Sequence, residues 1–290
     1  MIGKICGTGS SIPVKIMDND DLSNMVDTND AWIRERTGVE KRHIAESEST
    51  VSMAVEAGRQ ALAQTGIRPE ELDMIVVSTM SPDAVLPCTA CEVQKAIGAE
   101  GAVCFDLQAA CTGFIFAYNT AQAYIQSNMC RTVLLIGSER LSRLVDWTDR
   151  GTCILFGDGA GAAVLKAAEG RAYLPISHSD GKKGEALTCD RYIHMDGRAV
   201  FQFAVTRVPE VIREVLTKNE LLMDDIDYFV LHQANRRIVE AVAKRLRQPI
   251  EKFPMNLQEY GNTSSASIPI LLDEMNRSGK LKKGQKLVVA

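Results

Sequence analysis

The sequence predicts an α/β fold with a large share of parallel sheet. Short apolar segments alternate with longer helical segments along all 290 residues, which is typical of layered sheets and helices. A chain of this length can bury a large core, as one large domain or two half-domains. Hydrophobic residues at 46% and charged residues at 24% are ordinary values for a soluble protein.

The first half alternates strands and helices. Asp27, Thr28, Asn29 and Asp30 are N-cap candidates for a short helix carrying Trp32 and Arg36. A longer helix opens at Ser49 and ends before Gly66. Predicted strands cover residues 2–7, 74–78, 102–107, 132–137 and 160–166, and the other helices cover 88–97 and 111–127. Because residues 114–118 are almost all apolar, we expect the last of these helices to be buried.

The second half continues the alternation. Strands are predicted at 173–177, 192–195, 228–231 and 287–290, and helices at 200–219, 235–246 and 267–277.

Composition excludes several classes of protein. A formal charge of -4 argues against a general nucleic-acid binder. The N-terminus has no signal-peptide pattern, and no apolar run approaches the roughly 20 residues that span a bilayer. Eight cysteines without a secretion signal indicate reduced thiols in a cytoplasmic enzyme.

The segment 105–113 contains the main candidate for chemistry. It is typical of a strand that ends in a sharp turn, with Cys111 at the start of the following helix. The helix dipole and free backbone N–H groups there favour a nucleophilic thiolate. His232, after the strand 228–231, and Asn262, in a Gly-Asn-Thr turn, are two polar residues that could assist it. Taken singly, each of the three residue types is more often structural.

The order of these motifs resembles the β-ketoacyl-[acyl-carrier-protein] synthase III family. The resemblance covers residues 7–10, 32–38, 105–113, 149–152 and 156–163 and continues to His232 and Asn262. It implies a thiolase-like, five-layered αβαβα fold of two similar halves, residues 1–169 and 170–290. It also implies decarboxylative condensation of an acyl-CoA with a malonyl-[acyl-carrier-protein], in a homodimer without a bound cofactor or metal.

The resemblance assigns roles to residues. Cys111 would carry the acyl group, while His232 and Asn262 would donate hydrogen bonds to the enolate oxygen formed on decarboxylation. Trp32, Arg36 and Arg150 would form the mouth of a coenzyme A tunnel by stacking on adenine. Other tunnel positions would be Thr28, Phe156, Met195, Gly197, Phe201, Ala234 and Asn235.

Two further surfaces are expected. The helix after His232 carries Arg237, Lys244 and Arg245, a basic patch suited to docking an acidic carrier protein. Leu86 aligns with a family position that reaches across the dimer into the partner's acyl pocket. The resemblance implies acetyl-CoA as the starter, while the size of Leu86 leaves room for longer or branched acyl groups.

Other motifs and functions are less well supported. Cys88 and Cys91 have metal-binding spacing without a second pair, so a zinc site is not expected. The glycines of 157–161 precede a strand rather than a helix, which favours close packing over dinucleotide binding. The alternatives are a thiolase, a condensing enzyme of secondary metabolism, a papain-like protease and a non-catalytic acyl-CoA-binding relative. A thiolase would need a second cysteine near the C-terminus, and none follows Cys189.

The sequence departs from the family pattern in two places. The loop between Thr188 and Tyr192 is short, and the chain ends at Ala290 before the family's glycine-rich loop and last strand. That loop supplies one backbone donor of the family's oxyanion hole, so activity of a chain without it would be in doubt.

Overall fold

A five-stranded mixed sheet forms the base of the molecule in the computed structural model, which describes residues 1–290. β4 runs parallel to both β5 and β6, whereas β7 runs antiparallel to β6 and β1. In sheet order the strands are β1 (Ile2–Ser11), β7 (Gly159–Ala168), β6 (Thr132–Glu139), β4 (Met74–Ser78) and β5 (Val103–Leu107). The predicted alternation and parallel pairing of the first half are therefore present.

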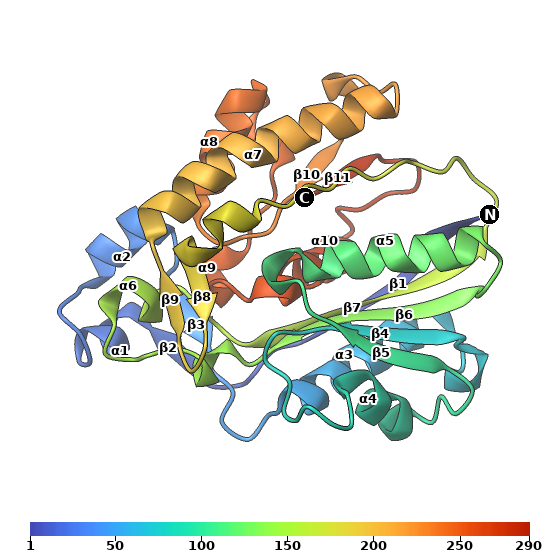
Figure 1. The fold of residues 1–290 in the computed structure, drawn as a ribbon, viewed down its shortest axis with the longest axis horizontal. Helices are drawn as coiled ribbons and strands as arrows, with labels where there is room; N and C mark the ends of the chain where they lie inside the picture. The colour runs from blue at the N-terminus through green and yellow to red at the C-terminus, as the bar shows by residue number, and fades with distance from the viewer.

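Helices cover both faces of this sheet (Figure 1). α3 (Thr50–Thr65) and α4 (Thr89–Ile97) pack on one face, where alanine and valine side chains form a buried cluster with β4, β6 and β7. α5 (Gly113–Gln126) and α10 (Ser267–Arg277) pack on the other face around Phe114, Ile125 and Ile268. Burial of this apolar area is the main stabilising term for such layers.

Two more layers lie beyond α5 and α10. β10 (Tyr228–Val230) pairs in parallel with β11 (Leu287–Val289), and Val230 belongs to the same buried cluster as α5 and α10. α7 (Gly197–Lys218) and α8 (Arg236–Leu246) cover the outer face of these strands. The sequence of layers is thus α, β, α, β, α, as Figure 1 shows.

Short elements gather at one end of the molecule, the left in Figure 1. The hairpin of β2 and β3 packs there with several one- to two-turn helices, and a second hairpin, β8–β9, follows residue 186. These elements are β2 (Ile16–Asp18), α1 (Asn19–Ser23), α2 (Asp30–Thr37), β3 (Lys41–His43), α6 (Arg150–Cys153), β8 (Leu187–Cys189), β9 (Ile193–Met195) and α9 (Leu257–Tyr260).

The predicted strand at 173–177 is wrong. Residues 169–180 form neither helix nor strand, and Leu174 is half exposed. The backbone N–H and C=O of Leu174 bond to the Asn219 side chain at 2.7 and 2.9 Å instead of to a strand, and Pro175 has no N–H to donate. β2, β3 and β8 were not predicted. The boundary between halves after residue 169 stays a prediction.

Candidate active site

Cys111 lies in a tight turn between β5 and α5. The chain passes through a 3-10 turn at Ala110–Thr112 before α5 begins at Gly113, two residues later than predicted. Ala110 has a φ of 45°, a left-handed conformation that costs energy in a residue with a Cβ. A Cβ at position 113 would overlap the Ser78 hydroxyl, so glycine lets the turn lie against the end of β4.

His232 follows β10 and is held at both ends. Its backbone N–H donates to the Ala290 carbonyl at 2.7 Å, and its Nδ1 lies 2.8 Å from the Ser267 hydroxyl at the start of α10. The other ring nitrogen, Nε2, is buried and has no hydrogen-bond partner. The ring is therefore fixed on one side and presents a free polar atom on the other.

Asn262 lies in the buried turn before α10. Its backbone bridges to the segment around Phe156, with bonds of 2.8 Å to the Leu155 carbonyl and 3.1 Å from the Gly157 N–H. The side-chain oxygen accepts from the Ser264 N–H at 2.9 Å. This bond assigns the oxygen and leaves the amide NH₂ as a donor.

Cys111 and His232 lie side by side although they stand 121 positions apart in the sequence, and Ser264, two residues after Asn262, lies beside both. Burial disfavours the Cys111 thiolate, but the positive charge of His232, with smaller contributions from the His232 and Ser264 side chains, outweighs it and lowers the pKa of the thiol. For His232, burial also opposes the charge, and the Cys111 thiolate more than compensates, so the pKa of the imidazole is raised. The pair thus favours thiolate and imidazolium.

The expected mouth of the coenzyme A tunnel is assembled from α2 and α6. The guanidinium carbons of Arg36 and Arg150 lie 5.6 and 5.0 Å from the centre of the Trp32 ring. Arg150 also donates to the Asp27 carbonyl at 2.9 Å. Because Arg150 already stacks on the indole, an adenine ring would have to displace it or use another part of the ring surface.

The remaining tunnel candidates lie around the same end of the molecule. The Thr28 hydroxyl is buried without a partner, which leaves it free for a ligand. Asn235 caps α8 through the Arg237 N–H and donates to the Arg36 carbonyl at 2.9 Å, so α8 and α2 are joined there. Phe156 is buried, Met195, Phe201 and Ala234 are half-buried, and Gly197 is exposed at the start of α7.

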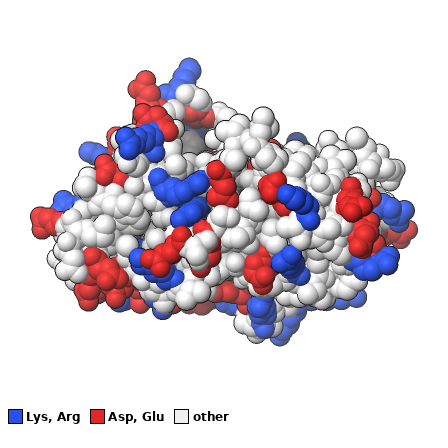
Figure 2. All heavy atoms as spheres, turned by 90° about the horizontal axis from the view of Figure 1, so that it is seen from below, with Lys and Arg blue, Asp and Glu red and all other residues white.

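Leu86 and the basic patch lie on the surface. Leu86 is 82% exposed, so little of its side chain contacts its own chain. Lys244 and Arg245 are exposed on α8 without a carboxylate partner, and Arg237 stacks on Phe201 at 5.5 Å. By contrast, acidic and basic side chains are interspersed on the face that carries α3 and α4 (Figure 2).

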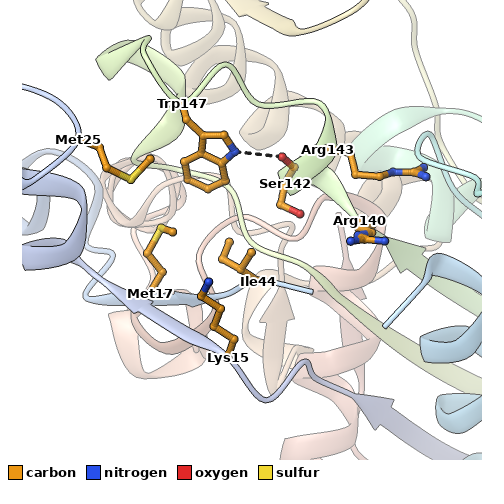
Figure 3. Close-up of a pocket in the computed structure, with 8 residues that line it drawn as sticks. All are labelled: Lys15, Met17, Met25, Ile44, Arg140, Ser142, Arg143 and Trp147. Carbon is orange, nitrogen blue, oxygen red and sulfur yellow. Dashed lines mark hydrogen bonds between the residues drawn. The ribbon is translucent and has the colours of Figure 1, made fainter. Parts of the chain in front are cut away.

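A pocket of about 330 Å³ is lined by eight other residues (Figure 3). Trp147, Met17 and Met25 form its apolar part. Its three cations are already bound: Lys15 pairs with Glu46 at 2.8 Å, Arg143 lies 3.6 Å from Asp83, and Arg140 donates to carbonyls. It contains none of the predicted site residues, so we do not assign it to the site.

Sequence reasoning missed three residues beside the site. Ser264 lowers the pKa of Cys111, Ser267 lies 2.8 Å from His232 Nδ1, and Glu139 is a fully buried carboxyl at the end of β6. Ser264 follows Asn262 by two residues and has a φ of 49°, but nothing in the sequence shows that its side chain acts on the thiol. No group of three or more His, Cys, Asp and Glu side chains is arranged to bind a metal ion, and none of the helices combines the length and apolar character needed to cross a bilayer.

Comparison with known proteins decides the family. Residues 105–181 match the profile of 3-oxoacyl-[acyl-carrier-protein] synthase III, and residues 216–290 match the profile of its C-terminal part. The β-ketoacyl-[acyl-carrier-protein] synthase III of Clostridium novyi is 46% identical over 99% of this chain and 94% of its own length. The chain belongs to the β-ketoacyl-[acyl-carrier-protein] synthase III family.

Solved structures of the family share the fold. The enzyme from Aquifex aeolicus superposes with a TM-score of 0.97 at 44% identity, covering 99% of this chain and 94% of that one. A priming β-ketosynthase of the R1128 polyketide pathway superposes at 0.96 with 35% identity, over 99% of this chain and 91% of that one. The predicted thiolase-like fold and family are confirmed, and a papain-like protease is excluded by the fold.

Proposed function

We propose that this enzyme condenses an acyl-CoA with a malonyl-[acyl-carrier-protein] through an acyl-Cys111 intermediate. The observation that carries the proposal is the placement of His232 beside Cys111, with the turn of Asn262 and Ser264 next to them. It is supported by relatives named β-ketoacyl-[acyl-carrier-protein] synthase III. The products are a 3-oxoacyl-[acyl-carrier-protein], coenzyme A and CO₂. The acyl-CoA is a substrate, and the reaction needs no bound cofactor or metal.

In the first half-reaction the Cys111 thiolate attacks the acyl-CoA carbonyl carbon. The tetrahedral intermediate collapses with cleavage of the bond to the coenzyme A sulfur. The imidazolium of His232 gives its proton to that sulfur, so coenzyme A leaves as a thiol. A thioester has then been exchanged for another thioester, which keeps the acyl group reactive.

Acylation prepares His232 for the second half-reaction. An acylated sulfur has no charge, so the thiolate that raised the pKa of the imidazole is gone, while the burial that lowers this pKa remains. Nδ1 can accept from the Ser267 hydroxyl, which places the proton of the neutral ring on Nε2. His232 thereby becomes a neutral donor that faces the substrate.

The second half-reaction uses two neutral donors. When the malonyl carboxylate leaves as CO₂, its electron pair passes to the thioester oxygen as an enolate. Nε2–H of His232 and the Asn262 NH₂ stabilise this oxygen. The enolate carbon attacks the acyl-Cys111 carbonyl, the carbon–sulfur bond breaks, and the thiolate is restored; a proton from solvent recharges His232.

We also infer a homodimer in the cytoplasm. β5 is an edge strand, Val103 on it is 59% exposed, and Val85 and Leu86 are more than four-fifths exposed, which favours cover by a second copy. All eight cysteines are free, including Cys88 and Cys91, whose sulfurs lie only 3.4 Å apart. Free thiols at that distance fit a reducing compartment.

Acyl transfer is tested by mass spectrometry. Incubation with acetyl-CoA should add one acetyl group to the Cys111 peptide, and Cys111→Ser should abolish it while the control Cys91→Ser does not. A label on another cysteine in the wild-type protein would overturn the assignment.

Decarboxylation separates the roles of the two donors. Asn262→Ala should reduce malonyl decarboxylation about 10²–10³-fold while Cys111 acylation stays near wild type. His232→Ala should reduce both, because the thiol also loses its counter-charge. Wild-type decarboxylation in both variants would refute the enolate role.

A second candidate is priming of a secondary-metabolite pathway. The likeness to the R1128 priming β-ketosynthase and the modest size of Leu86 favour it. The two candidates use the same chemistry and differ in starter. Competition between acetyl-CoA and longer or branched acyl-CoAs decides between them.

A further inference from the structure

Glu139 is a buried acid that the reaction described above does not use. It is the last residue of β6 and has no exposed surface. No lysine, arginine or histidine pairs with it: Arg140 donates to the carbonyls of Ala45 and Glu46, and Arg143 to those of Ser81 and Pro82. An ionised carboxylate without a cation is costly in such a place.

The hydrogen bonds of Glu139 join the end of β4 to the turn that follows Asn262. Oε2 accepts from the Ser81 hydroxyl at 2.5 Å and the Met80 N–H at 3.1 Å. Oε1 lies 2.9 Å from the Ser265 hydroxyl. Ser265 is adjacent to Ser264, whose side chain lowers the pKa of the Cys111 thiol. One carboxyl group therefore touches both sides of the Cys111 turn.

The Ser265 hydroxyl faces two acceptors but has one hydrogen. It lies 3.0 Å from the Ser78 carbonyl and 2.9 Å from Glu139. An ionised Glu139 would compete with that carbonyl for the hydrogen. A protonated Glu139 donates to Ser265 Oγ, and Ser265 then donates to Ser78, so both contacts are satisfied. Burial raises the pKa of Glu139 to about 7, although its hydrogen bonds act in the opposite direction. This direction agrees with a proton held on the carboxyl group.

The same region packs tightly against the nucleophile. Gly137, two residues before Glu139, lies against the Ser265 carbonyl, and a Cβ there would collide with it. Gly113, two residues after Cys111, lies against Ser78 and Ser265. A negative charge on Glu139 also acts against the thiolate of Cys111.

We propose that Glu139 is a positioning residue whose protonated form holds the turn 264–266 against the Cys111 turn and keeps a third charge away from the Cys111–His232 pair. Among the ionisable groups around it, Cys111 and His232 face this region from the α5 and β10 sides, while Arg140 and Arg143 point away to backbone carbonyls. The inference rests on Cys111 being the proposed nucleophile. Ionisation of Glu139 above neutral pH would make the thiol less reactive.

The test is the pH profile of iodoacetamide alkylation at Cys111, read on its peptide by mass spectrometry. Glu139→Gln keeps the size and removes the charge. At pH 8, Cys111 of this variant should be alkylated roughly fivefold faster than Cys111 of the wild type. Below pH 6, where residue 139 is uncharged in both proteins, the two rates should agree. Asp158→Asn, which alters another fully buried carboxyl bonded to Ser142, should leave the profile unchanged. Superimposable profiles for Glu139→Gln and wild type would overturn the proposal.

Infrared spectroscopy of the wild-type protein gives a second readout should Glu139→Gln not fold. A protonated-carboxyl band should be present at pH 6 and fade as the pH rises through about 7. Glu139→Asp, whose shorter carboxyl cannot reach both Ser81 and Ser265, should show this band shifted in frequency. Absence of any such band at pH 6 in wild type would refute the held proton. Alkylation and infrared readouts need no acyl-CoA, so they can fail or succeed independently of the proposed condensation.

Discussion

At the scale of single residues, the reactivity of Cys111 depends on groups that offset its burial. The Ser264 side chain lowers the pKa of the thiol, and its buried hydroxyl has no other hydrogen-bond partner. Ser264→Ala should therefore raise the pKa of the thiol and slow alkylation at pH 7 roughly tenfold, the effect of losing one hydrogen bond to a charged group. The pH dependence of iodoacetamide alkylation at Cys111 measures both the pKa of the thiol and the rate at pH 7.

Strain at Ser264 has to be separated from its hydroxyl. Its φ of 49° suits glycine better than alanine. Ser264→Gly lacks the hydroxyl but tolerates the backbone, so it should slow alkylation as much as Ser264→Ala. A wild-type rate in Ser264→Gly would show that backbone strain, not hydrogen bonding, explains the alanine variant.

Glu139 also links stability to pH. Burial raises its pKa from 4.5 to about 7, so between these values the folded protein holds a proton that the unfolded chain has lost. Stability must then fall as the pH rises through this window. Relative to Glu139→Gln, the wild-type protein should lose up to about 3 kcal/mol between pH 4.5 and 7, measured by urea denaturation. If the free energies of unfolding of the two proteins differ by the same amount at pH 4.5 and pH 7, the predicted titration of Glu139 is wrong.

At the scale of elements, α8 combines a buried apolar face with an exposed basic one. Val239, Val242 and Leu246 are buried, while Lys244 and Arg245 are exposed. Lys244→Glu with Arg245→Glu should raise the KM for malonyl-[acyl-carrier-protein] severalfold and leave the KM for acyl-CoA unchanged, with an effect that shrinks as salt rises. Lys282→Glu, on a distant loop, serves as the control. An equal rise in both KM values would indicate damage to α8 instead.

Element-scale patterns also show what could be predicted from the sequence. Strong local sequence signals mark the buried strands β4 and β6, and both lie where the sequence predicts them. The same holds for helix α3, whose N-terminus is capped by reciprocal hydrogen bonds between Ser49 and Ser52. The prediction of a strand at 173–177 rested only on its apolar residues, and the backbone of Leu174 bonds to the Asn219 side chain rather than to another strand. Local pattern cannot reveal a partner 45 residues away.

The site shows the same limit. Cys111, His232 and Asn262 stand in recognisable motifs, so they could be named before their meeting was visible. Glu139 ends an apolar strand, where the sequence indicates only a change from buried to polar residues. Its contact with Ser265 crosses 126 residues, and only the fold brings the two together.

At the scale of the whole molecule, the exposed edge of the large sheet and the exposed Leu86 both support the proposed dimer, in which a second copy of the chain would cover them. β5 has neighbours on one side only, and Val103 projects from it into solvent. Val103→Lys should therefore weaken dimerisation, measured by light scattering, because lysine on an edge strand opposes further pairing. Val289→Lys, on β11, is the matched control, and a dimer of unchanged stability in Val103→Lys would place the interface elsewhere.

In the proposed dimer, Leu86 would help to choose the starter at the partner's site. Its side chain is 82% exposed in the single chain, so we propose that it acts on the partner's acyl pocket. Leu86→Phe should fill the pocket and lower the rate with branched four- or five-carbon acyl-CoAs relative to acetyl-CoA, by the roughly 1–3 kcal/mol per methylene that an apolar pocket discriminates. Val85→Phe, the equally exposed neighbour, should leave the ratio unchanged. Mixed dimers provide the decisive arrangement, because Leu86→Phe combined with Cys111→Ser in one protomer should still narrow the starter range of a wild-type partner. If the mixed dimer shows the wild-type ratio of rates for branched acyl-CoA and acetyl-CoA, Leu86 does not act on the partner's pocket and belongs to the interface alone.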